Sequence, residues 1–149
     1  MISKEEVYRQ CVQIIGNKIS LLQDRLNELK ESVSNETKST AGDKHETARA
    51  HLQLEQEQIN NQLLTVLAQK SALEQIDIKQ SAAAIIKGSL VKTDLGYLFI
   101  SVAAGKIIVD AEPVIALSPQ SPLGEQLMGL KVGARTTMNG KTYQVERID

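Results

Sequence analysis

The chain has 149 residues, of which 42% are hydrophobic and 23% charged, values that are ordinary for a soluble protein. One Phe, three Tyr and no Trp leave few bulky side chains for a large core, so we expect part of the chain to be slender. Seventeen basic residues against eighteen acidic ones give a formal net charge of -1. This balance excludes a general positive field for nucleic acids, and any nucleic-acid role is expected to be indirect.

The N-terminal segment MISKEEVYRQ is charged and lacks the apolar stretch of a signal peptide. No later run reaches the roughly 18 apolar residues of a membrane span. Cys11 is the only cysteine, which excludes an internal disulfide and fits a reducing compartment. We therefore expect a cytoplasmic protein without a membrane partner, in which Cys11 serves packing alone.

Two long series of apolar residues, recurring every three or four positions, predict two helices that each carry one narrow apolar seam. The first series is Val7, Cys11, Ile15, Ile19, Leu22, Leu26, Leu29 and Val33, and the second is Ala48, Leu52, Ile59, Leu63, Val66, Leu73 and Ile76. Between them, the polar segment 34–43 predicts a turn, which Gly42 assists. Burying one seam against the other gives an antiparallel coiled-coil hairpin over residues 1–79, with its tip near residues 34–46 and an arm of roughly 45 Å.

The composition changes near residue 80, because all three prolines and seven of the nine glycines lie beyond it. Short runs rich in Val, Ile and aromatic residues predict strands over 88–93, 97–103, 106–110 and 114–117. Residues 121–129 predict a short helix that Ser121 caps, with Pro122 in its first turn. Asn139-Gly140 predicts a two-residue hairpin within 136–148. The fold class is thus α+β, with a small antiparallel sheet and one short helix over residues 80–149.

The sequence contains no phosphate-binding glycine loop, no nucleophile elbow and no cysteine or histidine cluster at metal spacing, so we do not expect an enzyme. His45 and His51 are six residues apart, point in different directions on a helix, and are expected to face solvent. Asp43 and Glu46, at the start of the second helix, allow two interpretations. Their spacing is that of a capping box. Two carboxylates at the tip of an arm also suit Mg²⁺ that another protein holds with further oxygen ligands.

Two segments resemble the bacterial Gre factors. The family's tip segment reads approximately GDLKENAEYHAAREQ where this chain has GDKHETARAHLQLEQ, and the matching residues are Gly42, Asp43, Glu46, Ala48, His51, Glu55 and Gln56. A second match covers residues 115–133, IALSPQSPLGEQLMGLKVG, and includes Ser118-Pro119 and Ser121-Pro122-Leu123-Gly124. The two motifs occur in the family's order, and the resemblance extends over nearly the whole chain.

The resemblance implies an N-terminal coiled-coil hairpin and an FKBP-like C-terminal domain. It also implies a transcription elongation factor that enters the secondary channel of RNA polymerase and stimulates cleavage of backtracked RNA. Asp43 and Glu46 would help the polymerase hold a second Mg²⁺, and the protein would have no cofactor of its own. Ser121 and Pro122 would belong to the polymerase-docking surface, and the RNA transcript would be met only within the elongation complex.

The chain departs from the family at the tip, where Lys44, Thr47 and Ala50 replace Leu, Asn and Tyr. Lys44 places a positive charge between the two carboxylates. A regulator that occupies the secondary channel without promoting cleavage is therefore the alternative. A chaperone or prolyl isomerase is a third reading, and it requires an aromatic-lined pocket from Tyr97, Phe99 and Tyr143.

Overall fold

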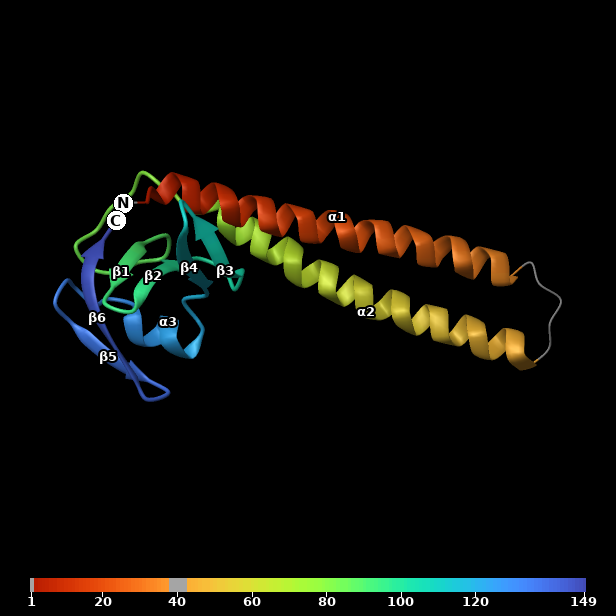
Figure 1. Cartoon of the computed structure of the whole chain (residues 1–149). Coiled ribbons are helices and arrows are strands. Elements are labelled where there is room, and N and C mark those ends of the chain that lie inside the picture. Colours follow the sequence, from red (N-terminus) through yellow and green to blue (C-terminus); the bar gives the residue numbers. More distant parts are fainter. Residues whose placement is uncertain (1, 38–42) are drawn as a thin grey trace. The chain divides into compact units, whose positions relative to one another are not determined.

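The computed structural model describes residues 2–37 and 43–149, without the side chains of residues 36, 37 and 43–45. Two long helices come first, followed by a six-stranded mixed sheet and a short helix, so the fold is α+β (Figure 1). Contacts divide the chain into two compact units. The helical unit comprises residues 15–68, and the sheet unit comprises residues 1–14 and 69–149.

The two predicted helices are confirmed as α1, Lys4–Thr37, and α2, Asp43–Glu74. The predicted turn over 34–43 was too long, because α1 continues to Thr37. Residues 34–37 contain neither Gly nor Pro, and polar residues alone lower helix propensity by only a few tenths of a kcal/mol each. Residues 38–42, which include Gly42 of the predicted turn, lie outside the described part of the chain.

Within the helical unit, the apolar seams of α1 and α2 pack against each other. Leu26, Leu29 and Ile59 form a buried cluster, and the partly buried residues around it are Leu22, Leu52 and Leu63. Arg25 adds an exposed ion pair to Glu55 across the helices, with 3.3 Å between Nη2 and Oε2. Apolar burial therefore accounts for most of the attraction, because exposed ion pairs contribute about 0–1 kcal/mol.

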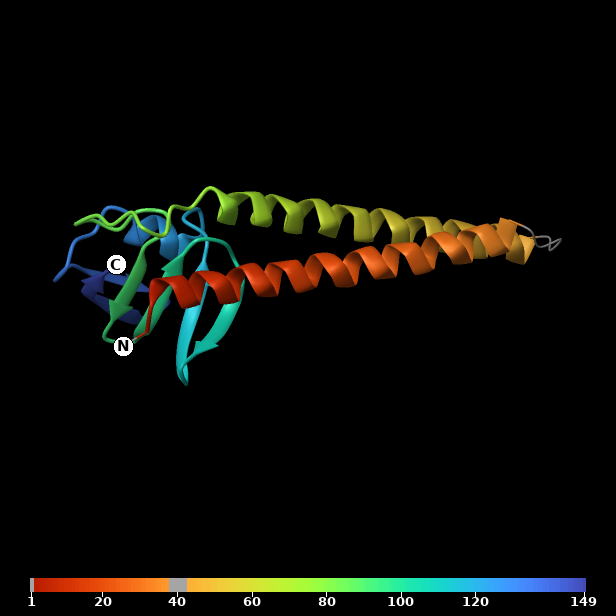
Figure 2. The same ribbon diagram turned by 90° about the horizontal axis from the view of Figure 1, so that it is seen from above.

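The sheet consists of β1 Leu90–Thr93, β2 Gly96–Ile100, β3 Gly105–Val109, β4 Glu112–Leu117, β5 Arg135–Met138 and β6 Lys141–Ile148. Its strand order is β3-β4-β2-β1-β6-β5. Figure 2 shows the strands from a second direction. The prediction of an antiparallel sheet was wrong for one pair, because β4 lies parallel to β2, with Tyr97 opposite Val114. The chain reverses into β3 and again into β4, and β4 then occupies the position beside β2, so two reversals restore the direction of β2.

The predicted short helix and hairpin are both confirmed. The helix α3 spans Pro122–Leu127, after Ser121 as its N-cap. The β5–β6 hairpin turns at Asn139-Gly140, where both residues have positive φ. A second tight hairpin, between β3 and β4, turns at Asp110 and Ala111 with φ of 50° and 65°. A non-glycine residue in this region is uncommon, and nothing in the local sequence predicts the geometry at Ala111.

The core of the sheet unit covers both faces of the sheet. On one face, α3 contributes Leu127 to a buried cluster that also contains Ile85, Val91, Leu98, Ile100, Leu117 and Val145. Phe99 alternates to the other face of β2 and is fully buried. The start of α1 belongs to this unit, where Val7 and Cys11 are fully buried and the Tyr8 hydroxyl donates to the carbonyl of Leu73 at 2.9 Å. None of the described helices combines the length and apolar character that crossing a membrane requires.

Candidate functional site

The first candidate site is the start of α2, where the sequence places Asp43 and Glu46. Both residues lie in the first turn of the helix, three positions apart in sequence. Glu46 is exposed. The side chain of Asp43 falls outside the described part of the chain. The exposed N-terminal amides of a helix favour negative charge, so this position suits carboxylates whether they cap the helix or bind a cation.

The charged neighbours of Glu46 bear on what the tip can bind. Arg49 follows Glu46 by three residues on α2 and is exposed, and Lys44 lies between the two carboxylates in sequence. A cation would therefore meet a site with little net negative charge. Two carboxylates also fall short of the six oxygen ligands that Mg²⁺ prefers. His51 is exposed as expected, while the side chain of His45 is not described.

The second candidate site is the loop Ser118-Pro119-Gln120-Ser121-Pro122, which leads into α3. The Ser121 hydroxyl donates to the Ser118 carbonyl at 2.7 Å and accepts from the Gly124 amide at 3.1 Å. Both of its hydrogen-bonding capacities serve the loop itself. Pro122 is exposed at the first position of α3, where its missing N–H costs nothing. Of the two predicted docking residues, Pro122 thus presents a free surface and Ser121 shapes the loop.

The loop before α3 requires glycine at position 124. A Cβ atom at Gly124 would lie 2.1 Å from the Ser118 carbonyl oxygen and 2.9 Å from the Ser121 Oγ atom. The backbone can approach this closely only where no side chain is present. The motif that resembles the Gre factors therefore has a steric reason of its own, independent of any partner.

Cys11 behaves as the sequence predicts, as a buried residue. Burial raises the pKa of its thiol to about 11 from an ordinary value of 9.0, against a smaller lowering by the neighbouring Ser101 hydroxyl. The Oγ atom of Ser101 is itself buried and makes no full hydrogen bond within the described residues. A thiol held in its neutral form is a poor nucleophile, so Cys11 is unsuited to catalysis.

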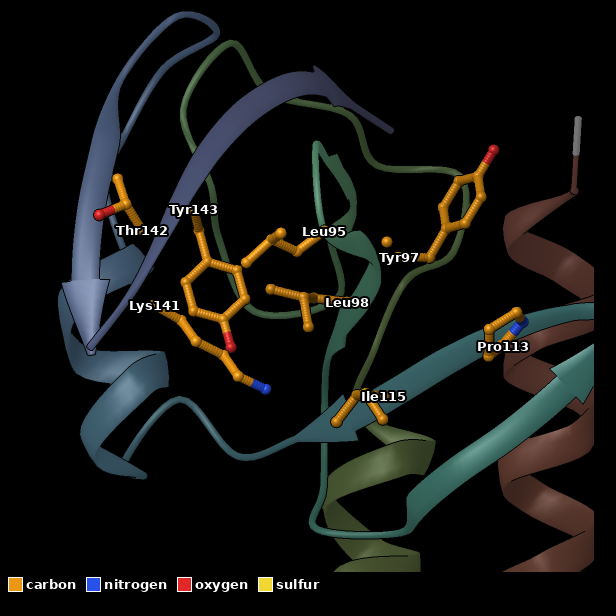
Figure 3. Close-up of a pocket in the computed structure, with 9 residues that line it drawn as sticks. Leu95, Tyr97, Leu98, Pro113, Ile115, Lys141, Thr142 and Tyr143 are labelled. Carbon is orange, nitrogen blue, oxygen red and sulfur yellow. The ribbon is translucent and has the colours of Figure 1, made fainter. Parts of the chain in front are cut away.

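Sequence reasoning did not anticipate an open groove in the sheet unit, which we call the β4–β6 groove. It has a volume of about 490 Å³, and its lining includes Leu95, Leu98, Pro113, Ile115, Lys141 and Tyr143 (Figure 3). A second hollow of about 320 Å³ continues it, sharing Ile115, Lys141 and Tyr143. The groove escapes sequence analysis because its residues come from three strands whose neighbours are set by the sheet order.

The groove differs from the aromatic-lined pocket that a prolyl isomerase would require. Phe99 is fully buried on the opposite side of β2 and does not line it. Tyr143 turns its ring toward the groove, whereas Figure 3 shows the ring of the buried Tyr97 turned away from it. Two of the three aromatic residues on which this hypothesis depended, Tyr97 and Phe99, are therefore committed to the core.

Comparison with known proteins does not place the chain in a family. No model of a protein family matches it, and a search of curated proteins returns no significant match. The likeness to Gre factors accordingly depends on the two sequence motifs and on their order along the chain.

Proposed function

We propose that this protein binds RNA polymerase and stimulates cleavage of backtracked RNA in the manner of Gre factors. The observation that carries the proposal is the tip segment, with Asp43 and Glu46 in the first turn of α2, the second of two long helices. The second motif, residues 115–133, supports it from a separate part of the chain. The hairpin would enter the secondary channel, and the exposed Pro122 would contribute to docking.

Catalysis in this proposal belongs to the polymerase. Asp43 and Glu46 supply oxygen ligands to a Mg²⁺ ion that the polymerase holds in part, which completes a coordination that neither protein provides alone. A metal bound with the help of Asp43 and Glu46 would supply charge stabilisation for the hydrolysis of RNA that the polymerase carries out. The protein itself needs only to deliver the two carboxylates.

The test is a transcript-cleavage assay on stalled, backtracked elongation complexes. We expect wild-type protein to shorten the transcript and Asp43→Ala or Glu46→Ala to reduce the rate by about 10- to 100-fold, the range for lost support of a bound metal. Glu57→Ala is the matched control, because Glu57 is an exposed carboxylate on α2 away from its first turn. Absence of cleavage by the wild type, or equal loss in the Glu57 variant, would refute the proposal.

The alternative is a regulator that occupies the secondary channel without promoting cleavage. Lys44, between the carboxylates, and the exposed Arg49 favour it, because positive charge at this position opposes the recruitment of a cation. In that case the wild type binds polymerase without shortening the transcript, and Lys44→Leu, which restores the family's residue, increases cleavage. Cleavage by the wild type that depends on both carboxylates would exclude this alternative.

A further inference from the structure

The β4–β6 groove is lined by two exposed large apolar side chains. Leu95 is 54% exposed and Ile115 is 42% exposed, although both belong to large residue types that folding normally buries. Leu98 is buried in the core beneath the groove and still forms part of its lining. The floor is therefore apolar and fixed by the core.

Two polar groups project into this apolar setting. Figure 3 shows the Lys141 side chain and the Tyr143 ring side by side at the groove, from the start of β6. Within the part of the chain that the structure describes, no hydrogen bond or ion pair engages the Lys141 ammonium or the Tyr143 hydroxyl. No Asp or Glu lines either hollow. The groove thus offers one uncompensated positive charge and one free hydroxyl donor.

This combination defines the chemistry of an occupant. Binding sites are mostly apolar, and a few placed polar groups set orientation and specificity. An ammonium and a phenol hydroxyl together suit a carboxylate, which accepts a charge-assisted hydrogen bond from each. The apolar floor at Leu98 and Ile115 requires an apolar side chain next to that carboxylate.

The extent of the groove favours a peptide over a small molecule. The hollow continues past Ile115, Lys141 and Tyr143 toward Pro122, Leu123 and Met138, which extends the apolar lining beyond the size of a single side chain. An extended peptide presents alternate side chains on one face, about 6.6–6.8 Å apart, and can fill both hollows while its backbone stays solvated.

We propose that the β4–β6 groove binds an extended segment of a partner protein in which an apolar residue is flanked by Asp or Glu. The apolar side chain lies on Leu98 and Ile115, and the carboxylate accepts hydrogen bonds from Lys141 and Tyr143. This site does not depend on the carboxylates of α2, but Ser121 and Pro122 line its second hollow, so the inference shares the docking loop of the proposed function. Peptide binding tests the groove, and transcript cleavage tests the carboxylates.

The experiment begins with a display library of random heptapeptides selected on the full-length protein. We expect enrichment of sequences with an acidic residue beside an apolar one, and fluorescence anisotropy of an enriched, labelled peptide then gives its affinity. Lys141→Gln should weaken binding about tenfold and Tyr143→Phe about threefold. Lys87→Gln, an exposed lysine that lines neither hollow, is the matched control and should leave binding unchanged.

Two further readouts keep the inference open to refutation. Exchanging the peptide's Asp or Glu for the amide should reduce affinity for the wild type but have little effect on the Lys141→Gln variant, because the same contact is already lost. Amide chemical shifts should change at Leu95, Leu98, Ile115 and Tyr143. Failure to enrich acidic–apolar sequences, equal weakening by Lys87→Gln, or shift changes confined to other surfaces would overturn the proposal.

Discussion

Gly124 offers the sharpest test of the structure, because two physical effects predict opposite results for Gly124→Ala. Gly124 lies within α3 and its φ is not positive, so helix propensity alone predicts stabilisation by about 1 kcal/mol. Steric contact predicts the reverse. The new methyl group would lie 2.1 Å from the Ser118 carbonyl oxygen, a separation that carbon and oxygen atoms do not tolerate.

The magnitude follows from what holds that carbonyl in place. Ser118 O accepts hydrogen bonds from the Ser121 amide at 3.0 Å and from the Ser121 hydroxyl at 2.7 Å. Moving it by about 1 Å weakens both bonds, at about 1 kcal/mol each. The Ser121 cap is also displaced, since its Oγ atom would lie 2.9 Å from the methyl carbon, and a lost cap costs about 1 kcal/mol. Subtracting the gain in propensity leaves a net destabilisation of about 2 kcal/mol.

Urea denaturation followed by tyrosine fluorescence measures the free energy of unfolding of the sheet unit, which contains Gly124. The chain has no tryptophan, and its three tyrosines, Tyr8, Tyr97 and Tyr143, all belong to the sheet unit. Gly129→Ala is the matched control, because Gly129 has φ of 84° but nothing within 4 Å of the added carbon, so it should cost only about 1–2 kcal/mol of backbone strain. A Gly124→Ala protein as stable as the wild type would refute the reasoning.

Three further predictions concern the helices and the thiol. Gly16→Ala should stabilise the helical unit by about 0.5–1 kcal/mol in urea titrations followed at 222 nm, because its added carbon meets nothing within 4 Å; destabilisation would contradict this open position. Leu29→Ala should cost about 2–3 kcal/mol in the same assay, whereas Arg25→Ala should cost at most about 1 kcal/mol; equal losses would show that apolar packing does not dominate. Cys11 should react with a thiol reagent at pH 8 at least about 100-fold more slowly in the folded protein than in urea, because its pKa is raised to about 11. Folding favours the neutral thiol, so the contribution of Cys11 to the free energy of unfolding is complete below pH 9.0 and falls as the pH rises toward 11. Cys11→Ala should remove this pH dependence.

Local patterns in the sequence were sufficient for the individual elements. The apolar residues at steps of three and four are the ones that the helices bury: Val7, Cys11, Ile15, Ile19, Leu26 and Leu29 in α1, and Ile59, Val66 and Leu73 in α2. The cap of α3 and the turn at Asn139-Gly140 were equally readable. These features depend on residues close together in the chain, so a local pattern is sufficient to predict them.

The candidate sites also differ in whether the local sequence is sufficient to predict them. Asp43 and Glu46 are three residues apart, and their place in the first turn of α2 could be predicted from the local sequence. The β4–β6 groove could not be found in this way, because Ile115 and Tyr143 meet only through the arrangement of their strands. The close contact at Gly124 likewise depends on a carbonyl six residues earlier that folds back over the start of α3.

The sequence by itself determined two helices that each carry an apolar seam, and the short polar segment that connects them. It also determined the strand-rich C-terminal half and the pair of carboxylates at the start of the second helix. Tertiary structure decided that β4 inserts beside β2 in parallel, that the first turns of α1 join the sheet unit, and that β2, β4 and β6 together form a groove. The physical reason is that period-2 and period-3.6 patterns specify which side chains are buried, while the choice of neighbouring strand depends on packing between segments far apart in the chain.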